Sequence, residues 1–242
     1  MLDSYIIYLP KSKKSSSVAN SSINRFKNIL NLDVKKWEGV DRYDVWQKFI
    51  NSDFKVNARN RFGAGYIDAE LGVFFSHYSL WKKCLELNRN ILILEHDAWP
   101  LFNFDLNLLE EFNGDVLNIG KPNWGSISNN YHPSEWVNKP KGILEREVCK
   151  KKHNIYNVWT KEEGYCHCDT MWLFGAHSYL LTPIGASKLI KATERGILPA
   201  DIYIRQDIIT IHDLLPHPVE QYTYAGFSLT RHDKNYESSW DY

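Results

Sequence analysis

The sequence lacks several features that would place the protein in a specialised class. Its four cysteines show no dense spacing, which argues against a disulfide framework and favours a reducing compartment. Lysine plus arginine equals aspartate plus glutamate at 29 each, so no overall positive charge attracts nucleic acid or anionic lipid. No apolar run approaches the roughly 20 residues that span a bilayer, and residues 1–10 lack a secretory pattern. These absences predict a cytoplasmic protein with no nucleic-acid partner and at most peripheral membrane association.

The composition is that of a folded protein, and its local patterns alternate between strand and helix. Hydrophobic residues make up 43% and charged residues 24% of the 242 residues, as in an ordinary globular domain. Short apolar runs predict strands, and apolar residues three or four positions apart predict helices. The predicted strands cover residues 5–9, 34–37, 91–94, 116–119 and 178–181, and the predicted helices cover residues 23–30, 69–87 and 183–196. This alternation predicts an α/β domain with a mostly parallel central sheet flanked by helices.

Cap residues and polar stretches mark where elements begin and end. Thr182 is placed as an N-cap with Pro183 in the first helical position, and Gly196 would end that helix. Residues 11–22 have no apolar periodicity, so we expect a loop there. Residues 122–164 are rich in Asn, Ser, Pro, Lys and Trp, which predicts a loop-rich insertion near the functional site, within one domain spanning residues 1–242.

The predicted strand at residues 91–94 ends in two acidic residues with a histidine between them. Its apolar residues predict burial on both faces, and Glu95, His96 and Asp97 follow where such a strand would leave a sheet. Open α/β sheets bind ligands at that edge. Two carboxylates one residue apart can converge on a hard divalent cation, although acidic residues in this position also simply begin turns. The residues alone leave both interpretations open.

Ordered blocks of sequence resemble glycosyltransferase family 25, the lipooligosaccharide and collagen galactosyltransferase family. Residues 69–81 are similar to its segment GEIGCALSH…W, and residues 92–98 to its LILEDDA. Residues 175–186 are similar to its GTHGYLISPRGA, and residues 198–201 to its PVD. Residues 5–9, 25–26 and 37–41 are similar to its opening strand, its Arg-bearing helix and its AVDG. The blocks occur in the family's order over most of the chain, which makes chance agreement a poor explanation.

The resemblance implies a GT-A-like α/β fold and a glycosyltransferase activity. A nucleotide-sugar donor, with UDP-galactose as the first choice, would give its sugar to a hydroxyl group of a glycan or glycolipid acceptor, with inversion. Glu95 and Asp97 would hold a divalent cation, Mn²⁺ or alternatively Mg²⁺, that neutralises charge on the departing nucleoside diphosphate. Asp97 would thereby belong to the catalytic residues.

The remaining site residues are also implied by the matched blocks. Inversion needs a carboxylate that takes the proton of the acceptor hydroxyl. Asp201 is the first candidate and Asp207 the alternative, while Asp201 could equally cap the segment that follows it. A single histidine more often makes a structural hydrogen bond than a functional one. With that alternative open, the residues expected to bind substrate are Glu70, His77, His96, His177 and Asp169. Of these, His77 and His177 would line the donor site and Asp169 would contribute to the acceptor side.

His96 is the main departure from the family pattern. The family has Glu-Asp-Asp where this chain has Glu95-His96-Asp97, so one negative charge is missing. A neutral imidazole can replace the acid as a nitrogen ligand or as a hydrogen-bonding group. The alternative is a catalytically silent relative that binds a glycan or scaffolds a complex of glycan-assembling enzymes.

Two other functions have weaker support in the sequence. Cys166-His167-Cys168, with Cys149 and His153 upstream, invites a zinc site but lacks the second ligand pair at zinc-finger spacing. A nucleotidyltransferase would need a glycine-rich phosphate loop near the first strand. Residues 11–17 are basic but contain no glycine.

Overall fold

A computed structural model describes residues 2–54, 67–121, 141–146, 172–173 and 176–222. Their centre is a seven-stranded sheet in the order β2-β1-β3-β7-β5-β8-β6, and a second sheet pairs β4 with β9. The strands are β1 Asp3–Tyr8, β2 Val34–Glu38, β3 Ile91–Glu95, β4 Ala98–Pro100, β5 Val116–Asn118, β6 Gly142–Glu145, β7 Ser178–Leu181, β8 Ile211–Leu215 and β9 Val219–Gln221. In the large sheet β1, β2, β3, β5 and β8 run in one direction, and β7 and β6 run in the other.

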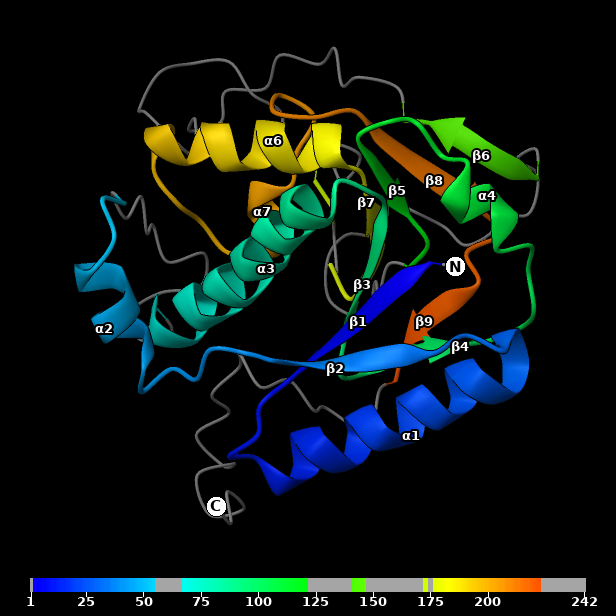
Figure 1. The fold of residues 1–242 in the computed structure, drawn as a ribbon, viewed down its shortest axis with the longest axis horizontal. Helices are drawn as coiled ribbons and strands as arrows, with labels where there is room; N and C mark the ends of the chain where they lie inside the picture. The colour runs from blue at the N-terminus through cyan, green and yellow to red at the C-terminus, as the bar shows by residue number, and fades with distance from the viewer. Residues whose placement is uncertain (1, 55–66, 122–140, 147–171, 174–175, 223–242) are drawn as a thin grey trace, which may run out of the picture.

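Helices cover the large sheet on both faces (Figure 1). They are α1 Lys13–Leu30, α2 Val45–Ile50, α3 Ile67–Leu87, α4 Asn107–Glu110, α6 Pro183–Ala192 and α7 Ala200–Tyr203, with a 3₁₀ turn at Thr193–Arg195. One apolar core lies between the sheet and α3, α6 and α7, and a second lies between the sheet and α1. The predicted α/β class with a mostly parallel sheet flanked by helices is confirmed. No helix among the described residues is both long and apolar enough to cross a membrane.

Strand β3 explains why its sequence is a continuous apolar run. Ile91 and Ile93 point into the core under α3, and Leu92 and Leu94 point into the core over α1. All four side chains are completely buried. A central strand covered on both faces needs apolar residues at every position, so the alternation typical of a half-exposed strand is absent.

The expected loop at residues 11–22 is wrong, because α1 already begins at Lys13. Ser12 is its N-cap, and the Ser12 hydroxyl accepts a hydrogen bond from the backbone N–H of Ser15 at 3.1 Å. The inward face of this half of the helix carries Ser15, Ala19 and Ser22, which are buried. Their hydroxyls bond to backbone groups outside the helix: Ser15 accepts from Leu9 and Ser22 donates to the Ala98 carbonyl. Small polar residues thus occupy core positions that a search for apolar periodicity overlooks.

The other predicted elements are present in the structure, which adds β4, β6, β8, β9, α2, α4 and α7. The helix predicted over residues 183–196 is α6 followed by the 3₁₀ turn, which ends before Gly196. Thr182 caps α6 by accepting from the Gly185 N–H at 3.1 Å, and Pro183 is the first helical residue. The expected insertion at residues 122–164 lies largely outside the described residues. Residues 142–145 within it form β6, an edge strand that pairs antiparallel with β8. That part of the insertion is regular structure.

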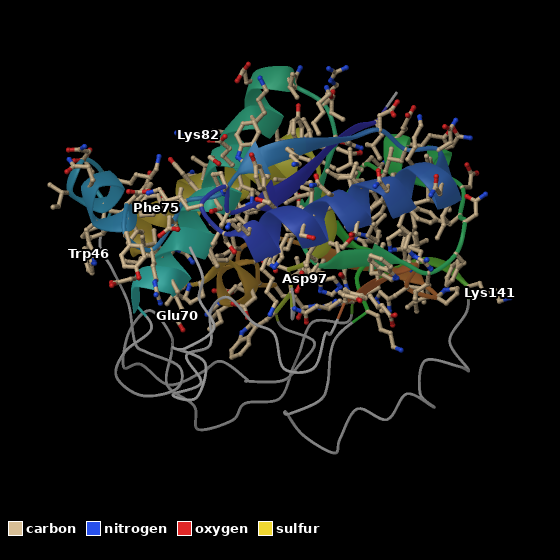
Figure 2. All side chains as sticks on the ribbon, turned by 90° about the horizontal axis from the view of Figure 1, so that it is seen from below. Trp46, Glu70, Phe75, Lys82, Asp97 and Lys141 are labelled. Atoms are coloured by element: carbon tan, nitrogen blue, oxygen red, sulfur yellow. The ribbon has the colours of Figure 1, made fainter. Side chains whose placement is uncertain are left out.

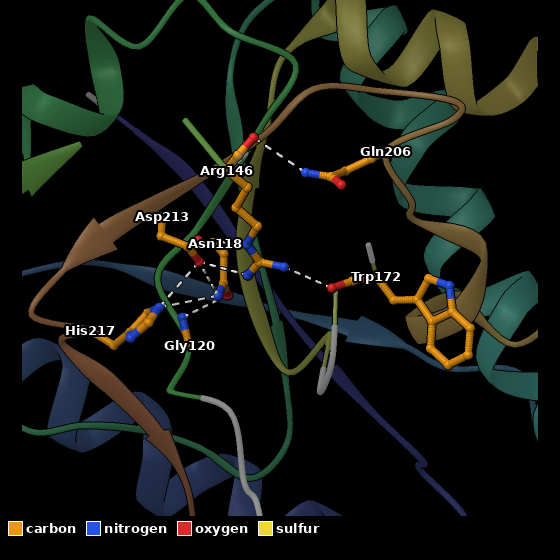
Figure 3. A network of polar contacts seen from close by, with 7 residues as sticks. All are labelled: Asn118, Gly120, Arg146, Trp172, Gln206, Asp213 and His217. Atoms are coloured by element: carbon orange, nitrogen blue, oxygen red, sulfur yellow. Dashed lines mark hydrogen bonds and ion pairs between the residues drawn. The ribbon is translucent and has the colours of Figure 1, made fainter. Parts of the chain in front are cut away.

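A buried polar network joins β5, β6 and β8 (Figure 3). Arg146, directly after β6, donates two hydrogen bonds to the Asp213 carboxylate, one of them at 2.6 Å, and a third to the Trp172 carbonyl at 2.7 Å. Asn118 donates to Asp213 at 2.8 Å, and His217 lies 3.3 Å from the same carboxylate. Burial would raise the pKa of Asp213, but the Arg146 charge and hydrogen bonds hold it well below its usual range. This ion pair fixes the edge of the sheet.

Replacing Asp213 with asparagine should lower the free energy of unfolding by about 3 kcal/mol at pH 7, because Arg146 would keep a buried charge without its partner. Folding lowers the pKa of Asp213, so its contribution is complete above about pH 3.9, the unfolded value, and is lost as the pH falls further. Urea denaturation should therefore show that the difference in the free energy of unfolding between wild type and Asp213→Asn becomes smaller from pH 7 to pH 3.

The matched control is Asp33→Asn, which removes an exposed ion pair. Asp33 accepts from Lys27 at 2.8 Å, and its side chain is 70% exposed. Such pairs contribute at most about 1 kcal/mol, so this variant should remain close to wild type at every pH. The role of the ion pair between Asp213 and Arg146 would be contradicted if both variants lost the same free energy of unfolding. It would also be contradicted if the loss in Asp213→Asn did not change with pH.

Candidate functional site

The acidic turn after β3 joins the two sheets of the protein. Glu95 is the last residue of β3, and its backbone N–H donates to the His177 carbonyl at 2.8 Å. After His96 and Asp97 the chain enters β4, which pairs with β9 rather than with the large sheet. The turn therefore lies where the central strand leaves the apolar core. The two acidic side chains reach the boundary between the sheets without interrupting either one.

Glu95 is held by a chain of buried side chains. Its Oε1 lies 3.2 Å from Nε2 of His77 on α3. Nδ1 of His77 lies 2.9 Å from the hydroxyl of Tyr179 on β7, and the Trp81 indole N–H donates to that hydroxyl at 2.9 Å. His77, Tyr179 and Trp81 are at most 1% exposed, whereas the Glu95 side chain is 26% exposed. The chain thus runs from the core to a carboxylate that solvent and ligands can reach.

Three histidines from separate parts of the sequence surround Glu95. Burial would raise the pKa of Glu95, but the hydrogen bond from His77 and the nearby rings of His77, His96 and His177 lower it below its ordinary value. The carboxylate is therefore ionised at neutral pH. A side chain at Gly120 would collide with His177, because a Cβ there would stand 2.6 Å from the ring nitrogen Nε2. The absence of a side chain at Gly120 makes room for His177 beside the site.

Asp97 is buried and keeps one oxygen without a hydrogen bond. Its side chain is 3% exposed, and its Oδ2 accepts from the Gln221 side chain on β9 at 2.7 Å. Its backbone carbonyl accepts from the Tyr222 N–H at 2.7 Å. Among the described residues Oδ1 has no hydrogen-bond partner. A buried carboxylate oxygen in this state is costly, and a bound cation would satisfy it.

The charges of Glu95 and Asp97 are not balanced by lysine or arginine within the described part of the chain. Three other buried aspartates, by contrast, each form an ion pair. Asp3 pairs with Lys35 at 2.9 Å, Asp115 with Lys188 at 2.7 Å, and Asp213 with Arg146. The described residues contain no cluster of three or more His, Cys, Asp or Glu residues arranged for a metal ion. Two carboxylates fit Mg²⁺ or Mn²⁺ when phosphate oxygens and water supply the remaining ligands.

The other predicted residues lie at different distances from this centre. Glu70 is seven residues before His77 on α3, which places both on the same side of the helix about 10 Å apart. Figure 2 shows Glu70 and Asp97 on the same side of the molecule, the lower side in that view. Asp169 lies outside the described residues. The same is true of all the residues considered for zinc, Cys149, His153, Cys166, His167 and Cys168, so that interpretation stays untested.

Asp201 and Asp207, the two candidate bases, differ in their surroundings. Asp201 is the second residue of α7 and is half-buried; Pro199 is the N-cap, so Asp201 does not cap this helix. Asp207 receives two hydrogen bonds from the fully buried guanidinium of Arg205, one of them at 2.8 Å. Both oxygens of Asp207 are engaged by this ion pair, so Asp201 stays the first candidate for the base.

Sequence inspection did not single out Trp81, Tyr179 and Gln221 as functional residues. Trp81 and Tyr179 stand inside matched blocks, but their apolar neighbours make them look like ordinary core residues. Gln221 comes to Asp97 only because β4 pairs with β9. No local pattern around Gln221 indicates that pairing.

The uncompensated charge predicts an unusual response to mutation. In a buffer with a chelator, the free energy of unfolding of Asp97→Asn should equal that of wild type or exceed it by about 1 kcal/mol. A buried neutral amide with an unmet hydrogen bond destabilises the folded state less than a buried carboxylate in the same position. Urea denaturation measures this directly. The control Asp115→Asn removes an acid that is paired with Lys188 and should lose about 2 kcal/mol. A loss in Asp97→Asn as large as in Asp115→Asn would show that Asp97 has a partner that stabilises its charge.

Comparison with protein-family sequence models gives a match over most of the chain. The sequence model of glycosyltransferase family 25 (LPS biosynthesis protein) matches residues 1–204, which include β1 to β7 and α7. No curated protein sequence matches the chain. The match covers Glu95, Asp97 and Asp201 but ends before β8 and β9.

Proposed function

The chain belongs to glycosyltransferase family 25, and we propose that it transfers a sugar from a nucleotide-sugar donor to a hydroxyl group of a glycan or glycolipid in lipopolysaccharide biosynthesis. The family suggests a glycosyltransferase of that pathway. The observation that carries the proposal is the pair Glu95 and Asp97, whose charge no described lysine or arginine balances. A donor diphosphate is itself an anion, so it can bind beside two carboxylates only together with a cation.

Glu95 and Asp97 would hold that cation, Mn²⁺ or Mg²⁺. Asp97 offers Oδ1, which lacks a hydrogen-bond partner among the described residues, and Glu95 offers Oε2, since Oε1 is engaged by His77. When bound, the cation supplies charge neutralisation for the departing nucleoside diphosphate. Both oxygens lie at the edge where β3 ends, which is the edge at which α/β sheets bind nucleotides.

Transfer with inversion requires a group that accepts the proton of the attacking hydroxyl. We assign this role to Asp201, because Asp207 is engaged by Arg205. Inversion and galactose from UDP-galactose are the family's implied chemistry, and they belong to this proposal. A GT-A-like arrangement of the domain, a single domain over residues 1–242 and a cytoplasmic location likewise stay predictions.

The second candidate function is that of a silent relative that binds a glycan without transferring a sugar. His96 in place of the family's middle acid is the observation that favours it. Glu95 and Asp97 argue against it, because a protein without a charged ligand gains nothing from keeping two uncompensated acids near its core.

Turnover of a panel of UDP-sugars with Mn²⁺, followed by mass spectrometry, should separate these functions. Wild type is expected to consume a donor, and Asp97→Ala should reduce turnover by about 100-fold or more, the usual effect of losing one group that stabilises transition-state charge. Asp33→Ala is the control on the exposed surface. Full turnover by Asp97→Ala would disprove the role of this carboxylate. A wild type that neither turns over a donor nor gains thermal stability from UDP with Mn²⁺ would favour the silent relative.

His96→Asp tests the departure from the family pattern. If His96 simply replaces the middle acid, restoring the carboxylate should raise Mn²⁺-dependent turnover, because a third negative charge strengthens cation binding. Initial rates over a Mn²⁺ titration measure the change. A large fall in turnover would instead show that the imidazole has a role in this chain that an acid cannot fill.

A further inference from the structure

The hydrogen bonds around Tyr179 determine which nitrogen of His77 carries the proton. An indole N–H can only donate, so the Tyr179 oxygen accepts from Trp81 at 2.9 Å. The phenol then has one O–H to give, and His77 Nδ1 lies 2.9 Å away. Burial raises the pKa of Tyr179, so this hydroxyl keeps its proton. Nδ1 of His77 is thus an acceptor, and in a neutral ring the proton must be on Nε2.

The proton on Nε2 points at Glu95. Nε2 of His77 lies 3.2 Å from Glu95 Oε1, so the N–H donates to the carboxylate. The other tautomer would place the Nε2 lone pair against the Glu95 carboxylate, and it would leave the Tyr179 O–H without an acceptor among the described residues. No water is needed to complete the chain, because each nitrogen of His77 already has a partner and the ring is 1% exposed. Each hydrogen bond of the chain is therefore donated in the same direction, from Trp81 to Tyr179, His77 and finally Glu95.

Packing holds these groups in place. The rings of His77 and Tyr179 lie nearly parallel with centroids 5.8 Å apart. Trp81 stacks on Tyr203 at 5.4 Å and meets the edge of Phe74 at 5.6 Å. A side chain enclosed in this way has few alternative rotamers. The donor at the end of the chain thus stands in a defined position.

We propose that His77 is a positioning residue for Glu95, locked as the Nε2–H tautomer by Trp81 and Tyr179, and that it fixes one carboxylate oxygen so that the other faces the cation. A neutral donor does this without cancelling the negative charge, whereas lysine or arginine would form an ion pair as at Asp115 and Asp213. The part that concerns the cation rests on the proposed function. Both nitrogens of His77 are engaged inside the protein, so His77 acts through Glu95 and does not itself contact the donor.

The tautomer can be measured on the free protein at neutral pH. Two-bond ¹H–¹⁵N correlation spectra distinguish the two neutral forms, and the spectrum of His77→Gln identifies which signals belong to His77. We expect the Nε2–H form. An Nδ1–H form would overturn the proposal. This measurement needs neither a cation nor a donor, so its failure is separate from failure of the proposed glycosyltransferase activity.

The positioning role is tested by Mn²⁺ affinity, measured by titration calorimetry on the whole chain. Partners that orient a metal ligand typically contribute 10–100-fold in affinity or activity, so Tyr179→Phe should weaken Mn²⁺ binding about 10-fold. Tyr203→Phe is the matched control, because it removes another buried hydroxyl of the same core, which donates to the Leu189 carbonyl at 2.8 Å. It should lose stability but bind Mn²⁺ as wild type does. Equal affinities in the two variants would overturn the positioning role.

Rescue by a conservative variant separates positioning from simple packing. The side-chain amide of His77→Gln can donate to Glu95 from about the place of Nε2, whereas His77→Leu fills the space without a donor. We expect His77→Gln to bind Mn²⁺ at least several-fold more tightly than His77→Leu. Where donor turnover is detectable, kcat should follow the same order. Equal weakening in both variants, with both folded by circular dichroism, would indicate that His77 only fills space.

Discussion

The burial of β3 on both faces is the constraint on which the rest of the structure depends. Its side chains alternate between the core under α3 and the core over α1, so β3 holds the two layers together. A polar residue can enter this strand only where it leaves the cores. Glu95 stands at that limit, and the chain then turns at His96 and Asp97 to pair with β9. The position of the candidate site is thus a consequence of how the core is built.

The two carboxylates at this limit have different partners from Asp115 and Asp213, two other buried acids of the described chain. Asp115 and Asp213 are neutralised by Lys188 and Arg146 and fasten elements together. Glu95 and Asp97 instead each share one hydrogen bond with another side chain, His77 for Glu95 and Gln221 for Asp97. Such bonds orient a carboxylate but leave its charge for a ligand. The negative charges of Glu95 and Asp97 therefore lower the stability of the folded protein at this turn, as is common at functional sites.

The sequence predicts much of the fold because local signals and burial agree in most elements. The apolar run of β3 and the Thr182 cap of α6 are clear examples. The start of α1 is missed because buried serines replace apolar residues. For the site, family resemblance finds His77 and His177, which the structure places near Glu95. It does not find the tautomer of His77 or the role of Gln221, because both depend on pairings between distant segments.

The part of the chain beyond the family match completes the surroundings of Asp97. The match ends at residue 204, whereas Gln221 and Tyr222 provide the hydrogen bonds to the Asp97 side chain and backbone. The ladder between β4 and β9 sets both contacts, so the matched blocks alone do not define this carboxylate's orientation. Residues 205–222 also supply Asp213, the partner of Arg146 at the edge of the large sheet. The acidic turn therefore lies within the family match, while the groups that hold Asp97 come from residues beyond it.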